Sequence, residues 1–147
     1  MTKKSDKRPK WAYKHHVDVP TRWMDNDTYG HVNNVNYYSY FDTAVNSFLI
    51  EGGALDIHNG AVIGLVVETQ CKYFGPITFP ETVTAGIGVS KIGNSSVRYE
   101  IGLFVGEALE PVAQGYFIHV YVDRATRRPT SLQDTLKSLL ETILLSD

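Results

Sequence analysis

The sequence has few of the features that mark secreted and membrane proteins. It contains one cysteine, Cys71, so no disulfide can form within the chain, and such sparse cysteine use fits a reducing compartment. No stretch approaches the ~20 consecutive apolar residues that a membrane-spanning helix needs. The basic N-terminus is not followed by an apolar segment of the kind found in secretory signals. The sequence therefore predicts a cytoplasmic protein with no membrane partner.

Internal repeats and low-complexity segments are also missing, and a length of 147 residues predicts one folded domain. Positive charge is concentrated at the N-terminus, where residues 1–14 carry six of the 14 Lys and Arg side chains and one acid. This leader has no apolar periodicity, so we predict a disordered basic tail over residues 1–13 and a single domain over residues 14–147. The remainder is acidic, which argues against a nucleic-acid partner.

Apolar periodicity divides the domain into one strand, one helix, four strands and a final helix. The helix is expected over Val35–Glu51 and ends at Gly52 and Gly53. Because apolar residues cover most of its circumference, it should be enclosed by other elements. Ser131 is expected to cap the final helix. Strands are expected at residues 15–23, 61–73, 83–89, 97–105 and 113–121, where apolar residues alternate with polar ones.

The short connections between these strands predict antiparallel neighbours. Long antiparallel strands twist, so the sheet can curl around the single helix, which gives an α+β fold. The apolar strand at residues 61–73 would aggregate if one edge stayed unpaired. Pairing with a second copy removes that hazard, and the sequence therefore predicts a homodimer.

A polar loop, "DNDTYGHVNN", stands directly before the predicted helix. Its Asp25-x-Asp27-x-x-Gly30 spacing matches the first half of a calcium-binding EF-hand. Tyr29 and Asn36, however, occupy the positions where such a loop needs an oxygen ligand and a bidentate Glu. The loop is therefore not expected to bind a metal. A cap for the helix and a catalytic site remain the two interpretations.

The run from Asp27 to Tyr37, "DTYGHVNNVNY", and the segment "VDRATRRPTSL" near the end resemble the 4-hydroxybenzoyl-CoA thioesterase-like family of acyl-CoA thioesterases. The resemblance extends from about Tyr13 to the C-terminus. It implies the hot-dog fold, a curled sheet around one long helix, and hydrolysis of acyl-CoA. It also implies homodimers that often pair into homotetramers, with the site at the subunit interface. No metal or cofactor is implied beyond the CoA of the substrate.

The same resemblance implies that Asp27 is the catalytic carboxylate and that the backbone N–H of Asn34 holds the thioester carbonyl. Two departures limit it. Tyr29 stands where plant-type acyl-carrier thioesterases have Asn, so an Asn–His catalytic pair is not available. Residues 93–95 are uncharged where some members have an Arg-Arg-Lys cluster for the CoA phosphates. The nucleotide is therefore held elsewhere, or the acyl group arrives on an acyl carrier protein.

The residue types suit this chemistry. A carboxylate can activate water or attack a thioester directly. The first N–H groups of a helix lack partners and lie at its positive end, which favours a developing oxyanion. His31 is a further catalytic candidate. Candidate substrate contacts are Gly30, Asn33 and Tyr37 around the helix start, Glu68 and Thr69 on a strand expected opposite the helix, and Arg124, Arg127 and Arg128 for the CoA phosphates.

Other interpretations stay open at this level. The two aspartates and the asparagines are also good turn and cap residues, His31 can be a packed histidine, and Cys71 is expected to be inert. A hydratase or dehydratase of the same fold would use Asp27 and His31 to move a proton. A non-catalytic protein that binds acyl thioesters would keep the pocket without turnover.

Overall fold

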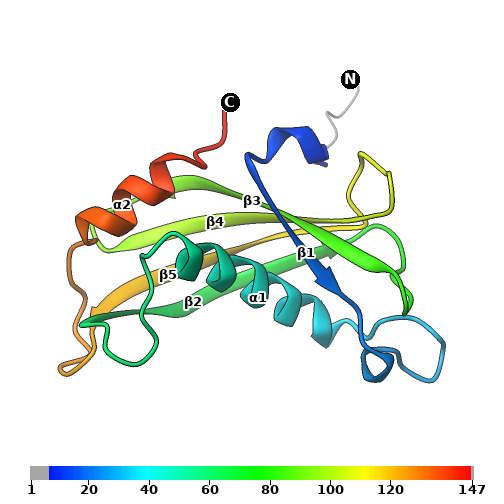
Figure 1. Cartoon of the computed structure of the whole chain (residues 1–147), viewed down its shortest axis with the longest axis horizontal. Helices are drawn as coiled ribbons and strands as arrows, with labels where there is room; N and C mark the ends of the chain where they lie inside the picture. The colour runs from blue at the N-terminus through cyan, green and yellow to red at the C-terminus, as the bar shows by residue number, and fades with distance from the viewer. Residues whose placement is uncertain (1–6, 147) are drawn as a thin grey trace.

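The computed structural model describes residues 7–146. One antiparallel sheet, with strand order β1-β3-β4-β5-β2, curls around a long helix, α1, that lies across one face (Figure 1). Within the described residues no helix is both long and apolar enough to cross a bilayer. The strands are β1 (His15–Pro20), β2 (Val62–Tyr73), β3 (Thr82–Ile92), β4 (Ser96–Val105) and β5 (Ala113–Asp123), and the helices are α1 (Val35–Glu51), α2 (Asp134–Glu141) and the short η1 (Lys10–Ala12) and η2 (Trp23–Asp25).

Helix α1 has the bounds that the sequence predicts. Phe41, Ala44 and Val45 on this helix are completely buried and belong to the main core cluster, together with residues of β1, β3, β4 and β5. Gly53 adopts a left-handed φ of 74°, and its N–H bonds the carbonyl of Ile50, which ends the helix as expected. The nearly continuous apolar surface of α1 is thus explained by enclosure in the sheet.

Three boundaries differ from the predictions. The first strand ends at Pro20, because proline cannot donate to a sheet ladder, and the chain then turns through η2. Ser131 does not cap the final helix, because its Oγ donates to Asn94 and Gln133 is the N-cap residue. Strands β2 and β3 are consecutive but not adjacent, since β2 pairs with β5 at one edge and β3 lies between β1 and β4.

A β-bulge in β2 changes which side chains share a face. Val66 lies opposite His119 and Glu68 lies opposite Ile118, so Val67 is the extra residue. A bulge shifts the alternation by one position, because two residues then oppose one. The sequence predicts one common face for alternate residues from Ile63 to Tyr73. Instead, Ile63 and Leu65, before the bulge, lie on the opposite face from Thr69, Cys71 and Tyr73, after it.

The segment before β1 also differs from its prediction. Residues 7–13, expected in a disordered tail, contact the rest of the domain, and Lys10 N–H bonds the carbonyl of Leu109, in the turn between β4 and β5, at 2.9 Å. The ring of Tyr13, 1% exposed, lies over Gly86 and Gly102, which pair across β3 and β4. The two glycines leave the room that the ring occupies. The rest of the predicted tail, residues 1–6, lies outside the described residues.

Candidate active site

The polar loop before α1 is a closed turn. An isolated bridge between Asn26 and Val32 forms its base, and the N–H of Asp27 donates to the carbonyl of His31 at 2.9 Å. Gly30 donates to the carbonyl of Asp27 at 3.1 Å and has a φ of 82°, a conformation that favours glycine. This geometry presents residues 27–31 at the surface as one unit.

Contacts on the far side hold the loop against the connection between β2 and β3. Asn26 Oδ1 accepts the N–H of Phe79 at 3.1 Å, and Val32 N–H donates to the carbonyl of Ile77 at 2.7 Å. The side chain of Val32 is buried in the core. The loop is therefore anchored at both of its ends.

Asp25 fastens the loop to α1. Its carboxylate, 1% exposed, accepts two bonds from the Arg22 guanidinium at 3.0 and 3.1 Å and one from Tyr40 Oη at 2.8 Å. Burial alone would raise the pKa of this carboxyl, but the hydrogen bonds from Arg22 and Tyr40 outweigh burial and lower the pKa. The Asp25 carbonyl accepts from Asn33 N–H and Asn36 Nδ2. Asp25 is thus a structural residue that positions the helix start.

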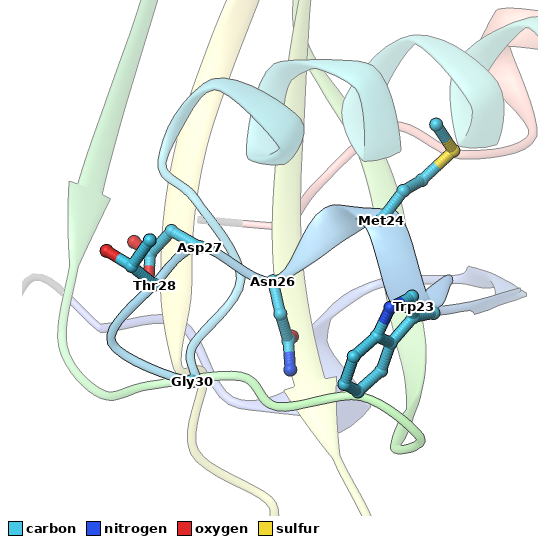
Figure 2. A pocket seen from close by; sticks show the side chains of 6 residues that line it. All are labelled: Trp23, Met24, Asn26, Asp27, Thr28 and Gly30. Carbon is cyan, nitrogen blue, oxygen red and sulfur yellow. The ribbon is translucent and has the colours of Figure 1, made fainter.

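Asp27 lines an open surface pocket of about 740 Å³. Its Oδ1 accepts the N–H of Tyr29 at 2.8 Å, and its other oxygen has no partner within residues 7–146. Figure 2 shows the side chains of Asp27 and Thr28 together on one side of the loop, while Trp23 and Asn26 project to another side. One carboxylate oxygen thus fixes the rotamer and the second is free for chemistry.

The start of α1 offers an unpaired donor. Asn33 Oδ1 accepts the N–H of Val35 at 3.1 Å, and Asn34 is the exposed N-cap residue. In the part of the chain that the structure describes, the N–H of Asn34 has no acceptor. Its carbonyl is approached by Tyr73 Oη at 3.4 Å, which places the end of β2 beside the helix start. A free N–H at the positive end of a helix can bind a developing oxyanion.

The remaining candidates around the helix start have different environments. His31 is exposed and contributes its backbone carbonyl, not its ring, to the loop. Tyr37 is buried in the core against the rings of Tyr40 and Tyr73. Burial raises the pKa of the Cys71 thiol to about 11, so this thiol stays protonated at neutral pH, and its expected inertness agrees with that state.

The two strand candidates lie on opposite faces of β2. Thr69 is paired with Phe117, a core residue, and so faces α1. Glu68 faces away from the helix, where its Oε2 accepts from Tyr116 Oη at 2.5 Å. The expectation that both residues lie opposite the helix is therefore not met for Glu68, because the two are adjacent in a strand and alternate.

The arginine candidates lie at the other end of β2. Arg124 Nε donates to the carbonyl of Gly60 at 2.5 Å, and its Nη2 donates to that of Ile57 at 2.7 Å. Arg127, with a φ of 63°, and Arg128 belong to the turn that follows β5. Within one protomer this turn is next to the start of β2, whereas Asp27 and Asn34 are next to its end.

Sequence reasoning missed part of the site. Tyr40 and Arg22 complete the Asp25 network, and an Arg three residues before an Asp is the only sequence signal for it. Trp23 and Met24 are strongly exposed beside Asp27. No group of three or more His, Cys, Asp or Glu side chains that could hold a metal ion occurs among residues 7–146.

Comparison with known proteins finds relatives that match most of the length of this chain. The model of the family described as "Thioesterase-like superfamily" matches residues 19–140. The crystal structure of the PA5185 protein from Pseudomonas aeruginosa strain PAO1 has a TM-score of 0.93 at 48% identity and covers 95% of this chain and 98% of that one. The uncharacterized protein YsmA of Bacillus subtilis (strain 168) is 27% identical over 83% of this chain and 82% of its own length.

A more distant structure confirms the fold. Slr0204, a 1,4-dihydroxy-2-naphthoyl-CoA thioesterase from Synechocystis, has a TM-score of 0.77 at 15% identity over 85% of this chain and 93% of that one. At this identity the likeness concerns the fold alone. The curled antiparallel sheet around one long helix is the hot-dog fold that the sequence predicts.

Proposed function

The chain belongs to the thioesterase-like superfamily, and from this membership we propose that it is an acyl-CoA thioesterase in which Asp27 is the catalytic carboxylate. The observation that carries the assignment is the free oxygen of Asp27 in an open pocket on the loop that leads into α1. Among residues 7–146, the loop before α1 carries one other carboxylate, that of Asp25. Asp25 is buried and fully engaged by Arg22 and Tyr40.

In the proposed reaction, Asp27 takes a proton from water while the water oxygen forms a bond to the thioester carbonyl carbon. The carbonyl oxygen becomes an oxyanion, which the N–H of Asn34 stabilises. The intermediate then collapses, the C–S bond breaks, and CoA leaves as a thiolate that needs little protonation. Direct attack by Asp27 would give an anhydride that water opens, with the same products. Losing one oxyanion donor typically costs about 3 kcal/mol of barrier.

The surrounding residues support these two groups. The bond from Tyr29 N–H fixes the Asp27 carboxylate, and Gly30, which has no Cβ, lets the loop backbone approach the substrate closely. The Asp25 network holds Asn33 and Asn36, and thereby the direction of the free N–H of Asn34. This rigid support is what positions a catalytic site accurately.

We propose a homodimer formed through the free edge of β2. Leu65, Val66 and Val67 are exposed there, and an apolar edge strand pairs readily with another copy of itself. Two-fold pairing makes the two β2 strands antiparallel, so the start of one lies beside the end of the other. The turn with Arg127 and Arg128 of one copy then lies near Asp27 of the second, where it can bind CoA phosphates or an acidic carrier protein. The Arg124 guanidinium is already engaged by the carbonyls of Gly60 and Ile57.

The test is an assay of the purified protein over a panel of acyl-CoA substrates, with free thiol and free acid measured together. A thioesterase releases both in equal amounts. With crotonyl-CoA, loss of enoyl absorbance without free thiol would instead identify a hydratase. Saturable binding of acyl-CoA without thiol release or loss of enoyl absorbance would identify a binding protein. Either result would reject the proposed reaction.

A further inference from the structure

A second cavity, of about 150 Å³, lies under the C-terminal half of α1 at the start of β2. We call it the His119 cavity. Its walls come from α1, the following loop, β2 and β5. They are mainly apolar with a few polar groups, and include Asn46, Leu49, Leu55, Ile63, His119 and Tyr121. Arg124 lies at its border.

His119 has an unusual environment for a histidine. The residue is 5% exposed, and within the described chain neither ring nitrogen makes a hydrogen bond, Nε2 being completely buried. Buried polar side chains nearly always have a partner, so a group without one calls for an explanation. Burial lowers the pKa of His119 to about 4, so the ring is neutral and offers one donor and one acceptor at neutral pH.

The neighbouring tyrosines add a second polar group. Tyr99 Oη and Tyr121 Oη are 2.6 Å apart and share one hydrogen bond. This bond uses the proton of one of the two hydroxyls. The proton of the second hydroxyl has no acceptor among residues 7–146. The cavity therefore combines an apolar volume with unsatisfied hydrogen-bonding groups on β5. That combination is typical of a ligand pocket.

The cavity is out of reach of the catalytic groups of its own protomer. Asn46 and Leu49 follow Asn34 by 12 and 15 residues on the same helix. At about 1.5 Å per residue, they lie roughly 20 Å from the proposed oxyanion donor. A short acyl group bound at Asn34 cannot span that distance.

In the proposed dimer, where the β2 edges of two copies pair about a two-fold axis, the cavity of one copy comes close to the catalytic groups of the other. Gly64 at the start of β2 borders the cavity, and Tyr73 at its end contacts the carbonyl of Asn34. In an antiparallel pair the start of each strand lies beside the end of its mate. The His119 cavity of one copy then lies beside Asn34 and Asp27 of the other, on the face of the sheet that carries α1.

Resting on the proposed function, we propose that the His119 cavity of one copy receives the acyl group of the thioester held at Asp27 of the second copy. We further infer that it selects a small acyl group with a hydrogen-bonding atom at its far end. A cavity of 150 Å³ holds about the volume of benzene, so roughly six to ten non-hydrogen atoms fit. The apolar walls contact the carbon chain, and the distal atom satisfies His119 or Tyr121.

Mixed dimers test whether the cavity acts on the other copy. Asp27→Asn removes the carboxylate, and Leu55→Trp fills the cavity from its loop side. The two variants are co-expressed with different tags, and the mixed dimer is purified through both. One of its two sites then combines the intact Asp27 of the Leu55→Trp copy with the intact cavity of the Asp27→Asn copy. The mixed dimer should therefore recover about half of wild-type activity. If the cavity serves its own protomer, the mixed dimer stays as inactive as its parents, which would overturn the proposal.

Substrate selectivity tests the cavity without relying on Asp27. Hexanoyl-CoA and 5-hydroxypentanoyl-CoA have acyl groups of equal atom number that differ only in the distal atom. We expect kcat/KM to favour the hydroxylated substrate about tenfold in the wild type, and His119→Phe to remove this preference. Leu55→Trp, or Gly64→Val if that variant fails to fold, should lower hexanoyl turnover at least tenfold. Unchanged selectivity in His119→Phe, unchanged hexanoyl turnover in the cavity-filling variant, or faster turnover of dodecanoyl-CoA by the wild type would each reject this assignment.

Discussion

The hydroxyl of Tyr40, in the second turn of α1, donates a hydrogen bond of 2.8 Å to Oδ2 of Asp25, a carboxylate 15 residues earlier. This bond connects the helix whose N-terminus is the proposed oxyanion site to the loop that carries Asp27. Both side chains are buried, so water cannot replace either of them as the hydrogen-bond partner. The bond therefore fixes the position of the catalytic loop relative to the helix.

Removing this hydroxyl should destabilise both the fold and the site. Tyr40→Phe leaves a buried carboxylate with one donor fewer, and hydrogen bonds to charged groups contribute about 1.5–3 kcal/mol. We expect the free energy of unfolding to fall by that amount in urea titrations, and kcat to fall while the variant is still folded. The matched control is Tyr38→Phe, since the Tyr38 hydroxyl makes no hydrogen bond within residues 7–146. Equal effects of the two variants would contradict this role of Asp25.

His119 gives the stability a measurable dependence on pH. The pKa of its ring is about 4 in the folded protein and about 6.5 in an unfolded chain, so between these values only the unfolded state binds the proton. Stability is therefore complete above pH 6.5 and declines as the pH falls toward 4, by at most about 1.4 kcal/mol per pH unit. Chemical denaturation from pH 7 to 4.5 measures this slope. In His119→Phe the slope should be smaller by that amount, and an unchanged slope would show that the buried ring is not the cause.

The pair of glycines under Tyr13 should tolerate no side chain. A Cβ at Gly102 would lie 2.8–2.9 Å from three atoms of the Tyr13 side chain, and one at Gly86 would lie 2.7–2.9 Å from three atoms of the same side chain. Gly102→Ala therefore displaces the ring, and overpacking of this kind typically costs about 1–3 kcal/mol. Gly75→Ala is the control, because its Cβ would meet only Val112, at 3.8 Å.

A double variant distinguishes this steric cost from a local strand preference. In Tyr13→Ala the ring is absent, so adding Gly102→Ala should cost much less than it does in the wild type. Thermal unfolding of the four proteins measures the coupling. Full additivity would show that Tyr13 does not rest on the glycine pair.

The proposed dimer depends on the free edge of β2. Val67, at the bulge, is 60% exposed, and Val67→Arg places a charge where the second copy would pair. We expect this variant to sediment as a monomer and to lose activity, because each site needs two copies. Leu109→Arg is the control, since Leu109 is equally exposed but lies in the turn between β4 and β5. A dimeric Val67→Arg protein with normal turnover would refute the β2 interface.

Periodicity and turn residues predict most of this fold, because the burial pattern of a helix or strand is written in its own sequence. Helix α1 is an example, since its apolar residues and the glycines at 52 and 53 give both its enclosure and its end. The bulge at Val67 could not be predicted in the same way. It depends on how β2 matches β5, and neither strand alone contains that information.

The candidate site shows the same division between local and long-range information. Asp27, Gly30 and Asn34 can be selected from the loop alone, because turn and helix-cap chemistry is local. The engagement of Asp25 by Tyr40 and the opposite faces of Glu68 and Thr69 need the tertiary structure. So does the His119 cavity, whose walls come from segments up to 78 residues apart, from Asn46 to Arg124.

The most direct test of the proposed catalytic role of Asp27 is the turnover number of Asp27→Asn with an acyl-CoA that the wild type hydrolyses. Asn can keep the hydrogen bond to Tyr29 N–H but cannot take a proton or attack, so kcat should fall by about 10²–10⁴ while the melting temperature stays close to that of the wild type. Asp134→Asn, at the start of α2, controls for loss of one negative charge. A folded Asp27→Asn protein that turns over at the rate of the Asp134→Asn control would contradict the central role of this carboxylate.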